Sequence, residues 1–330
     1  MERTVIVGDI HGCHAELVEL LAVAEVGPDD LLVSVGDLVD RGPAPAEVVR
    51  LFRERPNSLV LMGNHERKHV RGVFSYAQEI TRLQAGAGYA DMVTWMATLP
   101  YWFENEHVRV VHAALVPGVP LAEQREEVLC GSTRGERELK ALFPEGYWHE
   151  RYTDSVPVVF GHHVTGADPL IRDGRIFGLD TGACHGGYLT ALSVPDFTLH
   201  RVRAHADHWT AVRRTWQLPV LRSRPWAETT WDEIDAAGPF ADPASSAWVT
   251  ALREWAFRVR AVQPAILAAA QEQAARSEPA QFHAHPAAPL LFQARAGRLD
   301  AAALDRLCTT PERLCRLAAA FGIEVESRPA

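Results

Sequence analysis

The stretch Gly36-Asp37-Leu38-Val39-Asp40-Arg41-Gly42 decides how the rest of this chain is interpreted. It follows an apolar run, Leu31-Leu32-Val33-Ser34-Val35, which predicts a buried β-strand. Two carboxylates and a guanidinium framed by glycines suit a loop at the carboxyl end of a strand, where open α/β sheets place their ligands. One aspartate is suited to hold a metal ion, the other to orient a partner, and the arginine to bind an anion. For this stretch alone, a solvated turn with an Asp–Arg pair is the alternative.

The same kind of polar motif follows other predicted strands. Short, mostly β-branched apolar runs occupy residues 4–7, 31–35, 59–62, 108–111, 156–160, 175–179 and 188–194. The motifs after the first five runs are Gly8-Asp9-Ile10-His11-Gly12, the stretch around Asp37, Gly63-Asn64-His65-Glu66, Val111-His112-Ala113 and Gly161-His162-His163. Any one of them is compatible with a polar turn or a satisfied core histidine. Core packing does not require five such motifs after successive strands, so we interpret them as one site.

The spacing of strands and helices predicts the fold class. Amphipathic segments lie between the first three runs, and helices alternating with strands every 28 residues or so imply βαβ units with right-handed crossovers. After residue 105 the strands come closer together, as in a second sheet. We therefore predict an α/β core of two sheets flanked by helices.

The last third of the chain has a different character. Trp248, Leu252, Trp255, Val259 and Val262 repeat at helical spacing, which predicts a packed amphipathic helix. Residues 277–289 are rich in Pro, Ala and His and are interpreted as a linker. This part is therefore expected to be a mostly helical extension.

The composition is that of a soluble globular protein. The 330 residues carry a net charge of −9, and no apolar run approaches the ~18 residues of a membrane span. The amino terminus lacks the regions of a signal peptide, so we expect a cytoplasmic protein. Five scattered cysteines without a C-x-x-C pair predict reduced thiols. The negative charge weakly disfavours indiscriminate binding to nucleic-acid backbone, but it leaves a nucleotide substrate open because bound metal ions would dominate the local field.

The residue types in the five motifs indicate a class of metal ion. Asp, His and Asn side chains without thiolates suit first-row ions rather than a closed structural zinc site. The motifs supply six candidate ligands. One catalytic ion would use fewer, because it keeps a coordination position open for water or substrate. Two ions roughly 3.5–4 Å apart suit in-line displacement at phosphorus. We predict two divalent metal ions, with Mn²⁺ favoured and Fe or Zn²⁺ as alternatives.

In order and spacing, GDIHG, GDLVDRG and GNHE resemble the signature of the calcineurin-type metallophosphoesterases, in the branch of the phosphoprotein phosphatases. Within that branch, residues 8–17 and 179–192 resemble bacterial members, both Ser/Thr protein phosphatases and symmetrical diadenosine tetraphosphatases. The resemblance covers about residues 4–195 and implies a two-sheet β-sandwich flanked by helices. We accordingly predict a metallophosphoesterase catalytic domain at 1–200 and a mostly helical C-terminal extension of unknown role at 201–330.

The resemblance also implies a role for each motif residue. The implied metal ligands are Asp9 and His11 for the first ion, Asp37 as the bridge, and Asn64, His112 and His162 for the second ion. His65 would be the general acid, oriented by Asp40, and Arg41 would bind the phosphate. An imidazole beside a carboxylate is the expected way to keep a proton donor charged near neutral pH. Metal-bound hydroxide would attack phosphorus directly, so no phosphoenzyme is needed.

Other residues near the motifs have alternative interpretations. Arg134, in a glycine-flanked segment before the fifth strand, is a candidate second phosphate-binding arginine or a surface residue. His163 is the alternative to His162 as a ligand. His69 is expected on a solvated helix face, and Cys13 is expected to be a small buried filler rather than a nucleophile.

The favoured substrate is a dinucleoside polyphosphate or related nucleotide, because the segments around Asp180 and Thr190 resemble those of the tetraphosphatases. A phosphoserine or phosphothreonine protein and a nucleic-acid end are alternative substrates, so phosphoprotein and nucleic-acid partners stay open. No membrane partner is expected. A non-catalytic metal-binding module is the alternative of a different class, and the complete ligand set argues against it.

Overall fold

The computed structural model describes residues 3–223, 229–240 and 242–329. The chain forms two compact units, Met1–Thr215 and Trp216–Ala330, and the division falls inside α8 (His208–Ser223). The predicted boundary after residue 200 lies in β11 (Thr198–Arg203), a strand of the first unit. Within the described residues, no helix combines the length and the apolar character that crossing a membrane requires.

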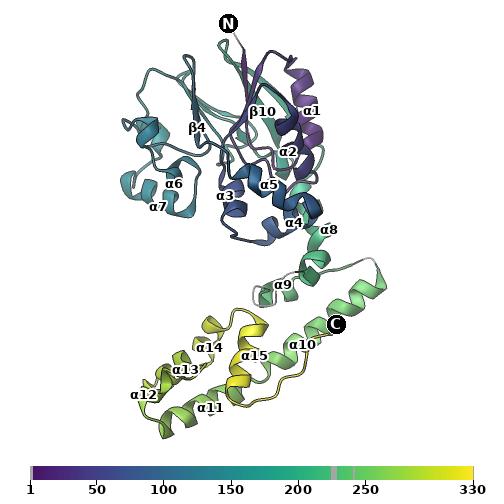
Figure 1. The fold of residues 1–330 in the computed structure, drawn as a ribbon, viewed down its shortest axis with the longest axis vertical. Helices are drawn as coiled ribbons and strands as arrows, with labels where there is room; N and C mark the ends of the chain where they lie inside the picture. The colour runs from purple at the N-terminus through teal and green to yellow at the C-terminus, as the bar shows by residue number, and fades with distance from the viewer. Residues whose placement is uncertain (1–2, 224–228, 241, 330) are drawn as a thin grey trace. The chain divides into compact units, whose positions relative to one another are not determined.

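Two mixed β-sheets form the centre of the first unit (Figure 1). In the described part of the chain, the first sheet has the order β11-β10-β1-β2-β3, with β9 paired to β10, and the second has the order β4-β5-β6-β8-β7. The strands of the first sheet are β1 (Thr4–Val7), β2 (Leu31–Ser34), β3 (Ser58–Val60), β9 (Asp180–Thr181), β10 (Tyr188–Val194) and β11. Those of the second are β4 (Trp102–Glu104), β5 (Arg109–Val111), β6 (Val158–Phe160), β7 (Leu170–Arg172) and β8 (Ile176–Gly178).

Each of the seven predicted apolar runs overlaps a strand, and the strands form two sheets, so the two-sheet prediction is confirmed. The sequence did not predict β4, β7, β9 or β11. Three of these, β4, β7 and β11, lie at sheet edges, where one side of the strand has no neighbour. Their residues are largely exposed or half-buried, so they lack the apolar pattern that marks a central strand.

Alternation along β1 and β2 explains the layers. Ile6 and Val33 pack in the core between the two sheets, together with Phe177 of the second sheet. Their neighbours Val5 and Leu32 point to the opposite face and pack under helices. Because successive strand residues face opposite sides, one apolar run supplies both the inner core and a helix-covered outer face.

Helices cover the outer faces of both sheets. On the first sheet, α1 (His14–Val23) and α2 (Pro45–Glu54) bury their apolar residues, and on the second sheet α6 (Glu126–Leu129) and α7 (Thr133–Leu142) do so. The remaining helical segments of this unit are α3 (Asn64–Val70), α4 (Tyr76–Ala85), η1 (Gly86–Gly88), α5 (Tyr89–Met96), η2 (Leu121–Glu123), η3 (Trp148–Arg151) and η4 (Ala183–His185). The described structure is therefore a helix-flanked two-sheet sandwich, as predicted.

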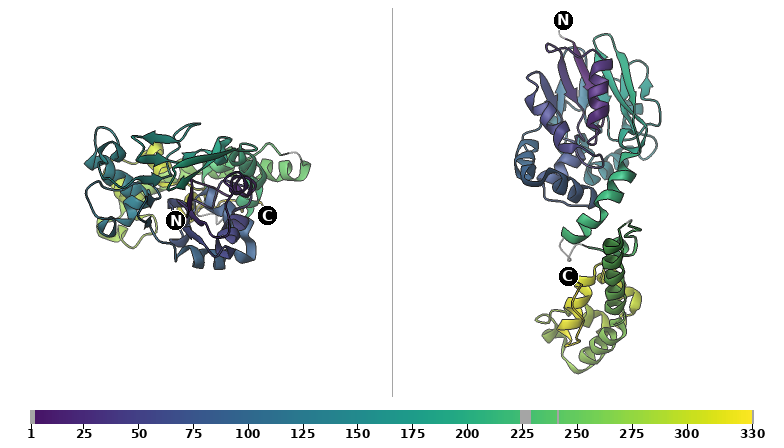
Figure 2. Two further views of the ribbon diagram at one scale, coloured as in Figure 1. Left: turned by 90° about the horizontal axis from the view of Figure 1, so that it is seen from above. Right: turned by 90° about the vertical axis from the view of Figure 1, so that its right-hand side faces the viewer.

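The second unit is helical. Its helices are α9 (Trp231–Asp235), α10 (Pro243–Arg260), α11 (Gln263–Arg276), α12 (Pro279–Phe282), α13 (Ala288–Arg295), α14 (Ala301–Leu307) and α15 (Pro311–Ala320). The longest, α10, begins where Asp242 Oδ1 accepts a 2.8 Å hydrogen bond from the Ser245 N–H. Its residues Leu252 and Trp255 share a core with Leu314 of α15, and Figure 2 shows these two helices side by side.

The linker interpretation of residues 277–289 was wrong. The segment contains α12 and the start of α13, and both Phe282 and Ala287 are buried. The prolines that suggested a linker lie in the first turns of these two helices, where Pro is well tolerated and does not indicate a loop.

Candidate metal and catalytic site

Five predicted site residues have an unusual backbone conformation. The angle φ is +46° at His11, +53° at Asp37, +68° at Asp40, +66° at Arg41 and +70° at His162. A left-handed non-glycine residue costs about 1–2 kcal/mol, and such strain gathers at functional sites. All five residues lie just after the ends of β1, β2 and β6, where the chain turns away from the sheets.

Both sheets contribute to the same site through the loop after β6. The backbone N–H of His162 donates to Asp9 Oδ1 and Oδ2 at 3.0 and 3.1 Å, although the two residues are 153 positions apart. A Cβ on Gly161 would lie 1.9 Å from Asp9 Oδ1, so only glycine allows this close approach. The carboxyl ends of β1 and β6, which belong to different sheets, therefore meet at one place.

The first group of candidate ligands surrounds Asp37. Its Oδ2 lies 3.7 Å from His11 Nε2 and 3.9 Å from His65 Nε2. His11 Nδ1–H donates to the Val39 carbonyl at 2.9 Å, which leaves the Nε2 lone pair facing the centre. Burial, followed by the nearby Arg41, lowers the pKa of His11 to about 3, so its ring is neutral and able to bind a cation.

The second group contains Asn64, His112 and His162. Asn64 Oδ1 lies 3.1 Å from His112 Nε2 and 2.9 Å from His162 Nδ1. Asp37 joins this group as well, since its Oδ1 is 3.5 Å from His112 Nε2. Asp37, His112 and His162 lie close enough together to hold one ion, as do Asp37, His11 and His65.

The donor atoms fit divalent cations. His112 Nδ1–H donates to the Val35 carbonyl at 3.0 Å, and burial lowers the pKa of His112 to about 4. The neutral Nε2 therefore presents a lone pair to Asn64 Oδ1, which is also an acceptor. Burial, together with Asp180 and Asp37, raises the pKa of Asp9 well above its usual value. A cation between these atoms would relieve both conflicts.

His65 and Asp40 form a buried pair beside the first group. His65 Nδ1–H donates to Asp40 Oδ2 at 2.5 Å, which turns His65 Nε2 towards Asp37. Asp40 also accepts from Thr81 Oγ1 at 2.7 Å and from the Gln78 amide. Burial opposes ionisation of Asp40, but His69 and His65 hold its pKa well below the usual range. The carboxylate is therefore charged and acts as an acceptor on every side.

The expectation that His69 lies on a solvated helix face was wrong. It is 2% exposed rather than solvated, and its Nε2 lies 2.9 Å from Asp40 Oδ1. Its other ring nitrogen lies 2.9 Å from the Tyr89 hydroxyl. The spacing offered a signal, because His65 and His69 are four residues apart on α3 and therefore share one helix face. Gln78 and Thr81, on α4, had no comparable signal.

Glu66 holds the Asp37 loop and was not assigned a role from the sequence. Its carboxylate accepts backbone N–H groups of Gly63 and Asp37 at Oε2, and of Leu38 and Val39 at Oε1, at 2.8 to 3.3 Å. Burial, followed by the nearby Asp37 charge, raises the pKa of Glu66 to about 8. Glu66 therefore holds the backbone of Asp37, Leu38 and Val39 in place rather than contacting the centre itself.

Arg41 spans the two imidazoles of the first group. Its Nη1 donates to His11 Nε2 and its Nη2 to His65 Nε2, both at 3.1 Å. The planar guanidinium thus faces the cluster of candidate ligands with both terminal nitrogens. This is the geometry in which an arginine binds a phosphate with two hydrogen bonds.

Two further predicted residues lie at the edge of the site. Arg134 is exposed on α7 and lines a groove of 310 Å³ that also reaches Asn64. His162 faces Asn64, whereas the neighbouring His163 turns away and its Nδ1 lies 2.6 Å from the Tyr147 hydroxyl. Cys13 is buried, as expected for a small filler.

The helix-flanked sandwich and its histidine–carboxylate clusters define the class of protein as a metallophosphoesterase. The profile of the calcineurin-like phosphoesterase family matches residues 2–184, so the chain belongs to that family and is a phosphoesterase, a hydrolase. The helical second unit lies outside the matched residues.

Several known proteins are similar to the chain. A symmetrical bis(5'-nucleosyl)-tetraphosphatase of Sodalis glossinidius is 28% identical over 279 residues, covering 63% of this chain and 97% of the relative. The protein of the same name from Yersinia pestis is 27% identical over 274 residues, covering 62% and 94%. A crystal structure of a proposed diadenosine tetraphosphatase aligns with a TM-score of 0.52 and 28% identity, covering 62% of this chain and 94% of that one.

Proposed function

We propose that the protein is a dimetal phosphoesterase that hydrolyses a phosphoanhydride of a dinucleoside polyphosphate or related nucleotide. The observation that carries the dimetal part is the position of Asp37, whose two carboxylate oxygens each face a separate histidine group. The names of the relatives support the substrate class. A carboxylate shared in this way is the expected bridge between paired ions.

The six predicted ligands would hold the two ions. Asp9 and His11 would bind the first, Asn64, His112 and His162 the second, and Asp37 both. When bound, such ions neutralise phosphoryl charge and make water more nucleophilic near neutral pH. Mn²⁺ is the favoured metal, and Fe or Zn²⁺ are the alternatives, because imidazole, carboxylate and amide oxygen suit these ions.

Three residues of the chain would serve the reaction itself. Arg41 would leave the imidazoles and bind the equatorial phosphate oxygens through both terminal nitrogens. His65 would donate the proton from Nε2 to the departing oxygen as the P–O bond breaks and water adds to phosphorus. Asp40 would hold the His65 ring in the correct orientation through Nδ1. Diadenosine tetraphosphate and one water would then give two ADP, with no covalent phosphoenzyme.

The experiment is a hydrolysis panel with Mn²⁺. The substrates are p-nitrophenyl phosphate, diadenosine tetraphosphate, a phosphothreonine peptide and a 3′-phosphorylated oligonucleotide, each tested on the wild type, on Asp37→Asn and on Asp29→Asn. Asp29 is exposed and outside the site, so its variant is the matched control. We expect preferential cleavage of diadenosine tetraphosphate into two ADP, lost only in Asp37→Asn.

Other outcomes would change the proposal in defined ways. Preference for the peptide would make the protein a phosphoprotein phosphatase, and preference for the oligonucleotide would make it a nucleic-acid end phosphatase. Activity that persists in Asp37→Asn would contradict the bridging role of Asp37. No hydrolysis, together with negligible metal after purification and dialysis against Mn²⁺, would overturn the dimetal assignment.

A further inference from the structure

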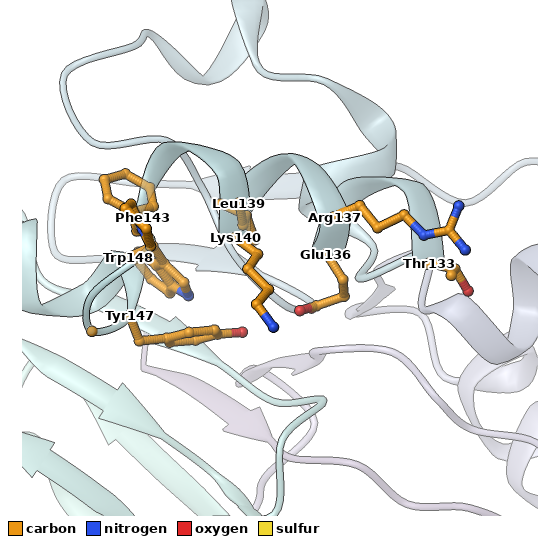
Figure 3. Close-up of a pocket in the computed structure, with 10 residues that line it drawn as sticks. Thr133, Glu136, Arg137, Leu139, Lys140, Phe143, Tyr147 and Trp148 are labelled. Atoms are coloured by element: carbon orange, nitrogen blue, oxygen red, sulfur yellow. The ribbon is translucent and has the colours of Figure 1, made fainter.

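A pocket adjoins the candidate metal site on the side of α7. It has a volume of 380 Å³, within the range of about 300–1,000 Å³ that is usual for small-molecule sites. Its walls are α7 and the segment 143–148 (Figure 3). The lining residues that matter here are Glu136, Leu139, Lys140, Phe143, Tyr147 and Trp148.

The polar end of the pocket touches the candidate second metal site. Glu136 Oε1 lies 3.4 Å from His162 Nε2 and 3.7 Å from His163 Nε2. The Tyr147 hydroxyl lies 2.6 Å from His163 Nδ1. A ligand with phosphate at the metal site could therefore extend from His162, past Glu136, into the pocket.

The other end of the pocket is apolar and aromatic. Figure 3 shows the Tyr147 ring below α7, with the Lys140 ammonium and the Glu136 carboxylate pointing into the same space. Leu139 and Trp148 are buried behind it. The Trp148 indole N–H lies near the Tyr147 hydroxyl, so these two rings form one continuous aromatic wall.

We propose that this pocket binds the nucleoside part of the substrate, with the base against the Tyr147 ring and the ribose hydroxyls on the Glu136 carboxylate. Lys140, one helical turn further along α7 than Glu136, then lies beside the nucleoside, where its ammonium can donate to a ribose or base acceptor. This inference rests on the proposed nucleotide substrate and adds where the nucleoside binds. A planar base matches an aromatic wall, and vicinal hydroxyls match a carboxylate that is only an acceptor. Phosphoserine and phosphothreonine carry neither group.

The direct test is binding of adenosine, which has no phosphate and does not depend on the metal site. Saturation-transfer difference NMR would be recorded on the metal-loaded wild type and on Tyr147→Leu, Tyr147→Phe and Trp102→Leu. We expect adenine-proton signals in the wild type, Tyr147→Phe and Trp102→Leu, and their loss in Tyr147→Leu. Trp102 is an exposed aromatic residue on β4 that does not line the pocket, so its variant controls for loss of any surface ring. Equal adenine signals in the wild type and Tyr147→Leu, or none in the wild type, would overturn the inference.

Kinetics separate this inference from the proposed function. For Tyr147→Leu, the kcat/KM ratio of diadenosine tetraphosphate to p-nitrophenyl phosphate should fall about tenfold or more, as expected when one aromatic stacking contact is lost. Lys140→Ala, an exposed change with little folding risk, should lower the same ratio. If diadenosine tetraphosphate is cleaved and neither variant changes the ratio, the pocket is wrong and the proposed function stands. If it is not cleaved but adenosine binds through Tyr147, the pocket stands and the substrate is another nucleotide.

Discussion

His65 Nδ1 and Asp40 Oδ2 are 2.5 Å apart, and both side chains are almost fully buried. Asp40 is 0% exposed, and its second oxygen lies 2.9 Å from His69 Nε2 and 2.7 Å from Thr81 Oγ1. Because Asp40 is held by other residues, it can fix the ring of His65 without moving itself. His65 Nε2 therefore faces Arg41 and Asp37, which is where a leaving oxygen would be protonated.

Asp40→Asn should lower the rate while leaving the metals bound. The amide removes the negative charge beside the His65 ring, and its NH2 group would face the Thr81 hydroxyl or the Gln78 amide, which are donors to Asp40. We expect kcat for diadenosine tetraphosphate to fall about 10–100-fold, as for other residues that orient a ligand or catalytic group. The measurement is kcat together with metal content by mass spectrometry. Loss of both metals would contradict the view that Asp40 acts only through His65.

His65→Asn should keep both metals and lose rate in a way that depends on the leaving group. General acid catalysis contributes about 10²–10⁴-fold, and the contribution is largest when the leaving oxygen is strongly basic. We expect a large fall in kcat for a simple alkyl phosphate and a small one for p-nitrophenyl phosphate, whose leaving group needs little protonation. Unchanged turnover of the alkyl phosphate would show that His65 is not the general acid.

Glu66→Gln should destabilise the fold and distort the metal site. An amide nitrogen would replace one carboxylate oxygen and would face two backbone N–H groups, such as those of Asp37 and Gly63. Leaving buried donors unsatisfied costs about 1–3 kcal/mol, so the free energy of unfolding should fall by that amount. Urea denaturation above pH 8, where Glu66 is ionised in the folded protein, measures it, with the exposed Glu54→Gln as the matched control. Equal unfolding midpoints for the two variants would count against this role.

Glu16 gives a prediction about pH. Burial opposes its ionisation, but the His208 ring at 2.6 Å and the His205 backbone N–H at 2.9 Å lower the pKa of Glu16 to about 2. The unfolded chain therefore binds more protons than the folded one between pH 2 and about 4.5. The stabilisation is complete above pH 4.5 or so and is lost as the pH falls towards 2.

Glu16→Gln should remove this pH-dependent stabilisation. The difference in unfolding free energy between wild type and variant should be largest near pH 5, where the contacting histidines stay charged, and shrink as the pH falls through the window below about 4.5. Chemical denaturation of both proteins at a series of pH values measures the difference, and other acidic groups cancel in the comparison. A difference that stays constant down to pH 2 would mean that the pKa of Glu16 is not lowered.

The sequence determined the core of this protein because its signals are local. A buried strand is visible as an apolar run, and a polar loop at its end is visible as the residues that follow. All seven runs overlap strands, and the segments after the first five bring Asp9, Asp37, Asn64, His112 and His162 into the same site. Edge strands such as β11 were not predicted, because their residues are largely exposed or half-buried and lack the apolar pattern of a central strand.

Tertiary structure alone decided what surrounds those residues. The contacts of Asp40 with Gln78 and Thr81, and of Glu16 with His208, join positions from 38 to 192 residues apart. Only the turn after β6 decides that His162, and not His163, faces Asn64. The pocket beside α7 likewise needs two segments to pack against each other. Sequence periodicity reports which face of an element is apolar, but a hydrogen bond or a cavity between distant elements depends on how those faces pack, which no local pattern specifies.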